Sequence, residues 1–176
     1  MIVGQQTFGW GDRGLCDKSD ALNILIQLYA GFNLGEHYTA SPFWQASVSL
    51  NRFVNPNSNA RAFLWSNLIK VDQSKNRPAQ DIEDRVCALG LLQREIAITS
   101  PNAVVFFTGP NYDSRIEKSF PELRWETKSH LLARMIHPKV PILFFRTYHP
   151  NYLRRSGHWN IILKIGQEII VRTHGN

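Results

Sequence analysis

The sequence predicts an α/β fold in three layers, α/β/α, in which helices cover both faces of a central, mostly parallel sheet of four strands. Two observations indicate this class. Four short apolar runs are typical of strands buried on both faces, and amphipathic stretches with helical periodicity separate them along the chain. The chain has 176 residues without an internal repeat or a long linker, so we expect a single domain over residues 1–176.

The first half of the chain alternates strand and helix patterns. A strand is expected over residues 1–5, ending in the glycine-containing loop GQQTFGWGDRG. Apolar residues recur at helical spacing over residues 20–32, behind a polar capping position. A Ser-Pro pair suits the cap and first turn of a second helix over residues 41–53. The AFLW run at residues 62–65 is the second predicted strand.

The second half repeats this alternation. A long helix is expected over residues 78–98, because acidic residues occupy its first turns, where the helix dipole favours negative charge. The apolar runs at residues 103–107 and 141–148 are the third and fourth strands. The shorter elements expected here are a helix after residue 113, a strand at 124–127, a helix around 130–136 and a helix over 159–164.

Charge and composition indicate the class of partner. Lysine and arginine number 20 against 14 acidic residues, which gives a net charge of +6 and suits a polyanion such as DNA. No apolar run approaches the roughly 20 residues of a membrane span, so we expect no contact with a membrane. The two cysteines, Cys16 and Cys87, and the scattered histidines lack metal-ligand spacing, and we expect neither a metal nor a cofactor. We expect a monomer in the reducing cytoplasm.

Polar stretches follow each predicted strand. They begin GQQTFGWG, SNLIK, TGPNYD and HPNYLRR, in chain order. Because the carboxyl ends of parallel strands meet at one edge of a sheet, we expect Gln6, Asn67 and His149 to surround a single pocket. An asparagine amide offers a donor and an acceptor, which suits the edge of a pyrimidine. Each feature also has a structural alternative: a plain turn for the glycine-rich loop and Asn67, and a solvated surface for the arginines.

Four of these motifs together resemble the uracil-DNA glycosylase superfamily over most of the chain. GQQTF at residues 4–8 stands where the family has GQDPYH, GINPG or GEAPG. FLWSN at 63–67 is similar to LLLN, and VVFFTGPNY at 104–112 is similar to a strand followed by a WGxYA-type turn. HPNYL at 149–153 resembles the closing HPSPL motif.

The resemblance implies the fold of that superfamily and a DNA glycosylase, which extrudes a pyrimidine-type base, uracil or a modified one, and hydrolyses its N-glycosidic bond to leave an abasic site. Such an enzyme acts in base-excision repair or in phage defence, on duplex or single-stranded DNA. The implied catalytic residues are His149, which donates to the base carbonyl, and Gln6, which orients the water, with Asp12 as an alternative base. The implied base-binding residues are Phe8, Phe43, Trp44, Asn67 and Asn151. The implied DNA-binding residues are Leu153 as a wedge in the base stack, Tyr152 beside it, and Arg154, Arg155 and Lys70 at the phosphates.

The departures from the family are informative too. Gln6 replaces the family's water-activating aspartate and cannot accept a proton, while Asn151 and Tyr152 replace a serine and a proline. Two cysteines exclude the iron–sulfur branches, so the chain resembles an outlying branch, similar to bacterial phage-defence glycosylases that attack modified pyrimidines. Phe8 stands where a tyrosine bars bulk at the pyrimidine 5-position. Two alternatives remain open: a nucleic-acid-binding pseudo-enzyme, and a hydrolase of free nucleotides, for which a wedge and paired arginines are superfluous.

Overall fold

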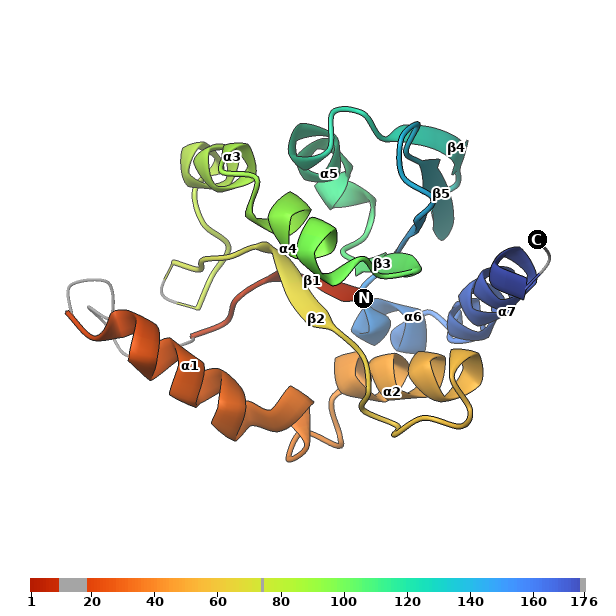
Figure 1. The fold of residues 1–176 in the computed structure, drawn as a ribbon, viewed down its shortest axis with the longest axis horizontal. Helices are drawn as coiled ribbons and strands as arrows, with labels where there is room; N and C mark the ends of the chain where they lie inside the picture. Colours follow the sequence, from red (N-terminus) through yellow and green to blue (C-terminus); the bar gives the residue numbers. More distant parts are fainter. Residues whose placement is uncertain (10–18, 74, 175–176) are drawn as a thin grey trace.

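The computed structural model describes residues 1–9, 19–73 and 75–174, and its centre is a mixed sheet of six strands in the order β2-β1-β3-β6-β5-β4 (Figure 1). The strands are β1 (Ile2–Gln6), β2 (Trp65–Ile69), β3 (Ala103–Phe107), β4 (Arg124–Lys128), β5 (Leu132–Ile136) and β6 (Leu143–Thr147). Strands β2, β1, β3 and β6 run parallel, and β5 and β4 extend the sheet in antiparallel pairing beyond β6.

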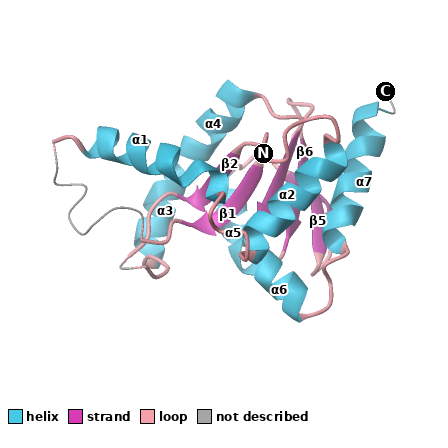
Figure 2. Ribbon diagram, turned by 90° about the horizontal axis from the view of Figure 1, so that it is seen from below, coloured by secondary structure: helices cyan, strands magenta, loops and turns pink. Residues whose placement is uncertain are grey.

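Helices cover both faces of this sheet, which gives the three layers that the sequence predicts (Figure 2). The helices are α1 (Ala21–Phe32), α2 (Pro42–Val54), α3 (Gln80–Ala88), α4 (Leu91–Thr99), α5 (Asp113–Ser119), α6 (Pro150–Arg155) and α7 (Ile161–His174), with short 3-10 turns η2 (Asn33–Gly35) and η3 (Pro110–Tyr112). Residues of α2, α6 and α7 share one hydrophobic core with the sheet, and residues of α3, α4 and α5 share the other.

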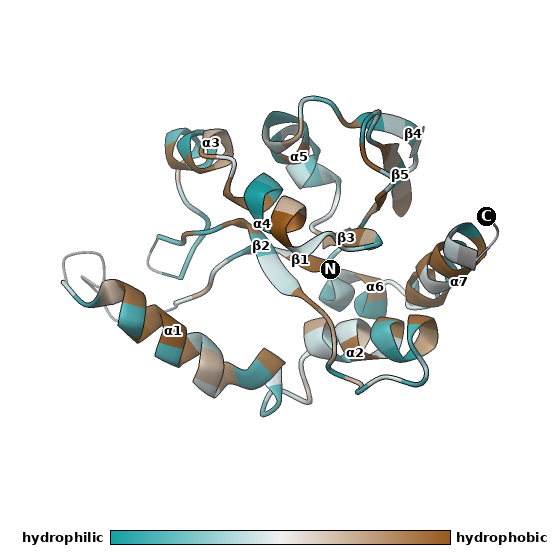
Figure 3. Ribbon diagram, viewed as in Figure 1, coloured by the Kyte–Doolittle hydropathy of each residue, from teal (hydrophilic) through white to brown (hydrophobic). Residues whose placement is uncertain are grey.

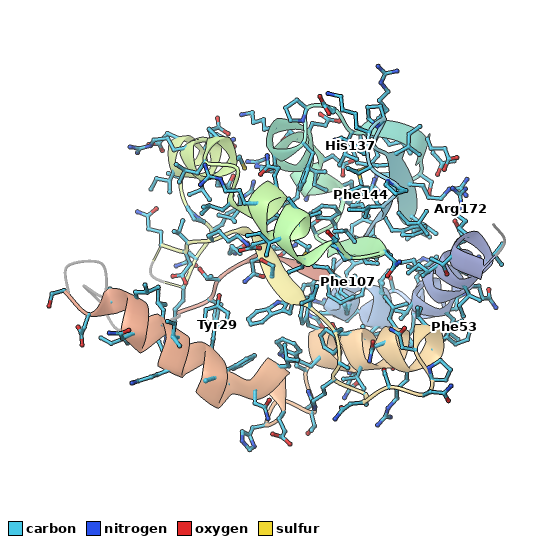
Figure 4. All side chains as sticks on the ribbon, in the orientation of Figure 1. Tyr29, Phe53, Phe107, His137, Phe144 and Arg172 are labelled. Carbon is cyan, nitrogen blue, oxygen red and sulfur yellow. The ribbon has the colours of Figure 1, made fainter. Side chains whose placement is uncertain are left out.

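Strand β3 shows why its sequence is apolar throughout. Val105 and Phe107 face the core under α2 and α7, whereas Val104 and Phe106 face the opposite core. Successive side chains of a strand point to opposite faces, so a strand covered on both sides needs apolar residues at every position. Figure 4 labels one residue of each core, Phe107 toward α2 and Phe144 on the other side of the sheet.

The predicted count of four strands is wrong, because β4 and β5 enlarge the sheet to six. The helix expected around residues 130–136 is strand β5 instead. Its residues Leu, Ala, Arg and Met favour helices in isolation, but pairing with β6 satisfies the backbone of β5 and buries Ala133 and Met135. Tertiary pairing therefore overrides local propensity at this edge.

Three further boundaries differ from the prediction. The second strand begins at Trp65 rather than ending there, so Asn67 lies within β2 instead of directly after it. The long helix expected over residues 78–98 is divided into α3 and α4, because Gly90 has a φ of 65°, which breaks the helical path. The last helix, expected at 159–164, begins at Ile161 and extends to His174.

Helix α1 stands out from the body of the molecule (Figures 1 and 2). Apolar residues occur along its length in Figure 3, although none of its residues is buried among those that the structure describes. Tyr29, labelled in Figure 4, packs its ring 5.7 Å from that of Trp65 on β2. Within the described part of the chain, no helix is both long and apolar enough to cross a membrane.

A buried ion pair ties β6 to the start of α5. The guanidinium of Arg146, 1 % exposed, donates from Nε to Asp113 Oδ1 at 2.9 Å and from Nη2 to Asp113 Oδ2 at 3.2 Å. Its Nη1 donates to the carbonyl oxygen of His130 at 2.8 Å, which anchors the segment before β5 as well. One arginine thus connects three segments of the chain through charge-assisted bonds.

Asp113→Ala should lower the free energy of unfolding by about 3–5 kcal/mol, because it leaves the charge of Arg146 buried without its partner. Asp81→Ala is the matched control, since Asp81 also lies in a first helical turn but pairs with Arg85 on the surface. The control should cost less than about 1 kcal/mol. Urea denaturation followed by circular dichroism measures both, and similar losses in the two variants would contradict a structural role for the buried pair.

Candidate functional site

A pocket of about 990 Å³ opens beside the carboxyl end of β1, the first half of β2 and the junction of β6 with α6. This volume lies at the upper end of the roughly 300–1,000 Å³ that is typical of ligand pockets. Six residues that the sequence singles out line it: Gln6, Phe8, Phe43, Trp44, Asn67 and His149. The expected convergence of Gln6, Asn67 and His149 on one pocket agrees with this geometry.

Part of the lining has no signal in the sequence motifs. Helix α1 and the turn after it contribute Gln27, Leu28, Phe32, His37 and Tyr38. These residues lie between the first motif, at residues 4–8, and the second, at residues 63–67, so the family resemblance gives no information about them. The apolar residues on the exposed helix α1 are a signal that could have found them, since exposed apolar surface often marks a binding groove.

Gly4 allows Asn67 to reach into the pocket. The two residues are register partners in the parallel pair of β1 and β2. A Cβ atom on residue 4 would collide with Oδ1 of Asn67 and would lie 3.4 Å from Cε2 of Phe43. Only glycine therefore leaves room for the Asn67 side chain, whose residue is 6 % exposed at the pocket floor.

His149 occupies the junction between β6 and α6. Its Nδ1 accepts a hydrogen bond from the backbone N–H of Asn151 at 3.2 Å, so the imidazole is the N-cap of α6. Burial lowers the pKa of His149, which favours the neutral ring. A neutral imidazole whose Nδ1 accepts must carry its proton on Nε2. His149 is thereby prepared as a hydrogen-bond donor in the pocket, and its ring packs near that of Phe43 at a centroid distance of 5.8 Å.

A hydrogen bond from a neighbouring tyrosine fixes the side-chain amide of Gln6. The hydroxyl of Tyr112 donates to Gln6 Oε1 at 2.6 Å, and burial raises the pKa of Tyr112, so the phenol keeps its proton. The guanidinium of Arg77 lies 4.7 Å from the centre of the Tyr112 ring. Arg77 in turn donates to the buried carboxylate of Glu83 at 2.7 Å. This chain of contacts fixes Gln6 in a set orientation, although an amide is not a base.

The loop after β1 is attached to a neighbouring turn. Phe8 is 68 % exposed at the rim of the pocket, and the backbone N–H of Gly9 donates to Asp72 Oδ2 at 2.6 Å. The other oxygen of Asp72 accepts from the backbone N–H of Lys75 at 2.9 Å. Asp12, the alternative base, lies outside the described residues.

The wedge role assigned to Leu153 is wrong. Its side chain is 0 % exposed and belongs to the core cluster that includes Leu50 and Ile162. Residues 150–155 form helix α6, and the helical turn directs position 153 into the protein while it leaves Tyr152 46 % exposed. Asn151 is exposed too, and it is not among the described residues that line the pocket; its backbone N–H serves His149 instead.

The three basic residues expected to contact phosphates differ in their exposure and in their contacts within the protein. Lys70 forms an ion pair with Glu95 of α4 at 2.6 Å and a hydrogen bond with Ser66, so its amine is already paired within the protein and its phosphate contact stays a prediction. Arg154 is exposed, donates to Oε1 of Gln45 and lies 4.8 Å from the ring centre of Trp159. Arg155 is exposed as well.

Comparisons with known proteins assign no family to this chain, so its function is argued from the geometry of the pocket. Neither a scan against protein-family models nor a search of curated proteins finds a match to this chain. Among the described residues, no group of three or more His, Cys, Asp or Glu side chains is arranged to hold a metal ion. The described part of the pocket lining includes four side-chain amides, two imidazoles and several aromatic rings, which suit a planar, polar ligand.

Gly4→Ala should lower the free energy of unfolding by about 1–3 kcal/mol, because the added methyl group overpacks the floor of the pocket. Gly31→Ala on α1 is the control, since a Cβ there meets no described atom within 4 Å. In a helix interior this control should be neutral or stabilising by up to about 1 kcal/mol. Thermal and chemical unfolding measure both, and a neutral Gly4→Ala would show that Asn67 does not need this space.

The protonation of His149 gives a second test. Because burial lowers its pKa, the unfolded chain, in which histidine titrates near 6.5, takes up the proton first as the pH falls. The stability contributed by the neutral ring is therefore fully present above about pH 6.5 and is lost as the pH falls through the folded pKa. His149→Asn keeps a capping residue without this titration and should show a flatter dependence of stability on pH. Ring ¹⁵N chemical shifts that place the proton on Nδ1 at pH 8 would contradict the assigned tautomer.

Proposed function

We propose that the protein is a DNA glycosylase with a fold of the uracil-DNA glycosylase type, which extrudes a pyrimidine-type base into the pocket and hydrolyses its N-glycosidic bond. The observation that carries the proposal is His149, a neutral imidazole that carries its proton on Nε2, lines the same pocket as Asn67 and packs 5.8 Å from the Phe43 ring. A leaving pyrimidine becomes an anion whose charge spreads over its ring carbonyl oxygens. A neutral donor placed at such an oxygen stabilises the transition state more than the ground state.

The base is read and held by the floor of the pocket. The Asn67 amide has a donor and an acceptor for the edge of a pyrimidine, and its residue is almost fully buried, which makes an unmatched edge costly. Phe43 and Trp44 from α2 supply apolar surface next to it. The large volume leaves room for a substituent on the base, and Phe8 lies at the exposed rim rather than on the buried floor.

The water needs little activation in this reaction. Cleavage of the N-glycosidic bond passes through an oxocarbenium-like sugar, which a neutral water molecule can attack. The bond between C1′ and the base nitrogen breaks and its electron pair leaves with the base. The water oxygen then bonds to C1′, and the proton it releases goes to solvent or to the departing base. Gln6, held by Tyr112, orients this water without accepting its proton.

A second candidate function is binding without catalysis. Gln6 supports it, because an amide stands where the resembled family has its water-activating carboxylate, and Tyr112 holds that amide firmly. A pseudo-enzyme of this kind would bind DNA through the same pocket and leave it intact. In that case Gln6→Asp should create base release that the natural protein lacks, since it restores a general base.

Alkali-labile abasic sites test the proposal. Single-stranded and duplex oligonucleotides with uracil, thymine, cytosine and 5-substituted pyrimidines are incubated with the protein, and the released base is identified by chromatography. Release of at least one pyrimidine from DNA is expected. Release from free nucleotides alone would support a nucleotide hydrolase instead, and its absence from every substrate would overturn the enzyme assignment.

His149→Ala should slow base release by roughly a hundredfold or more, because one donor to a developing oxyanion is worth about 3 kcal/mol. DNA binding should change much less, since the hydrogen bond strengthens only as the base becomes anionic. Single-turnover rates and binding constants, measured on the same oligonucleotide, separate the two effects. Equal losses in rate and affinity would make His149 a ground-state contact.

A further inference from the structure

Three stacked rings form a ladder beside the pocket. The rings of Tyr148 and Tyr152 are stacked within 23° of parallel, with centroids 4.1 Å apart, and the centroid of the His130 ring lies 6.0 Å from that of Tyr148. His130 Nδ1 and the hydroxyl of Tyr148 are hydrogen-bonded at 2.6 Å. We name these three residues, His130, Tyr148 and Tyr152, the aromatic ladder.

In the aromatic ladder Tyr148 is packed at the centre, and Tyr152 is exposed at one end. Tyr148 precedes the pocket residue His149 and packs over Gly109, where a Cβ would lie 3.2 Å from its Cδ1. Gly109 has a φ of +79°, a conformation that few other residues adopt, so this close approach depends on glycine. Tyr152 forms the outer end of the ladder on the first turn of α6, and it is 46 % exposed. An aromatic face of this kind is available to one further planar group.

The charge of the surrounding chain suits a polyanion. Residues 127–167 contain seven lysines and arginines and no aspartate or glutamate. Four of the seven, Lys128, Arg134, Lys139 and Arg146, form ion pairs with carboxylates outside this segment. Within the described part of the chain the other three form no ion pair. Two of these cations, Arg154 and Arg155, directly follow the ladder on α6 and are exposed. Stacking faces interleaved with exposed cations are the pattern of surfaces that bind single-stranded nucleic acid, because every base has a π-face and every nucleotide a phosphate.

The burial of Leu153 bears on whether the bound DNA is single-stranded or a duplex. Proteins that open a duplex frequently insert an apolar side chain into the base stack. The leucine of α6 is 0 % exposed and is not available for this insertion, whereas the neighbouring tyrosine presents a flat stacking face. A strand without a partner has no stack to hold open and offers its unpaired bases to such a face.

We propose that Tyr152 stacks on an unpaired base next to the nucleotide held in the pocket, so that single-stranded DNA is the substrate class of this protein. The inference rests on the proposed function for the occupant of the pocket. Arg154 and Arg155 contact the phosphates that flank the stacked base. The aromatic ladder takes no part in the reaction. It binds the DNA strand while the pocket residues act on the extruded nucleotide.

Fluorescence anisotropy with 5′-labelled single-stranded and duplex oligonucleotides of one sequence tests this inference. The wild-type protein should bind the single strand more tightly than the duplex. Tyr152→Ala should weaken single-strand binding roughly tenfold or more, in line with the loss of one base–aromatic stack, whereas Tyr152→Phe keeps the ring and should stay within about twofold. Leu163→Ala on α7, with the same 46 % exposure, is the control and should bind as the wild type does.

Two results would overturn the inference: duplex binding as tight as single-strand binding, or unchanged single-strand affinity in Tyr152→Ala. Circular dichroism confirms that each variant is folded, as expected for an exposed position. The abasic-site assay is read independently. Base release with a Tyr152-independent affinity would refute the ladder alone, and Tyr152-dependent binding without base release would refute the glycosylase alone.

Discussion

The parallel alignment of β1, β2, β3 and β6 is the constraint on which the candidate site depends. Because β1, β2 and β6 point the same way, Gln6 at the end of β1, Asn67 within β2 and His149 after β6 reach one pocket. Within that pocket the decisive contact is the one between Gly4 and Asn67, where the backbone of β1 leaves the space that the amide fills. A side chain at position 4 would displace the Asn67 amide from its place in the pocket.

His149 joins the stability of the fold to the chemistry proposed for the pocket. The hydrogen bond from the Asn151 N–H to His149 Nδ1 both satisfies a backbone donor in the first turn of α6 and fixes which ring nitrogen carries the proton. Formation of the capped first turn of α6 therefore also leaves the proton of the neutral His149 ring on Nε2, where it can be donated. Tyr112 acts similarly on Gln6, since a buried phenol from η3 fixes an amide from β1 across the carboxyl edge of the sheet. His149 and Gln6 are thus both oriented by hydrogen bonds from other parts of the fold.

The sequence was sufficient for features that depend on periodicity and strand direction. The AVVFF strand and the first two helices were predicted closely, and so was the meeting of Gln6, Asn67 and His149. It was insufficient where a distant partner decides the outcome. Strand β5 depends on the open edge of β6, and Lys70 depends on a carboxylate that lies 25 residues away in the chain. The motif HPNYL shows a third limit, because a short helix decides whether the tyrosine or the leucine faces outward.

The buried pair of Arg146 and Asp113 has a consequence for how this protein can diverge. A sequence that replaces either residue alone passes through a state with an isolated charge in the interior, which folding tolerates poorly. A simultaneous exchange for two apolar residues of matching volume avoids that state. Positions 113 and 146 should therefore covary as a unit among descendants of this chain, and a mismatch between them would mark a recombined or non-functional copy.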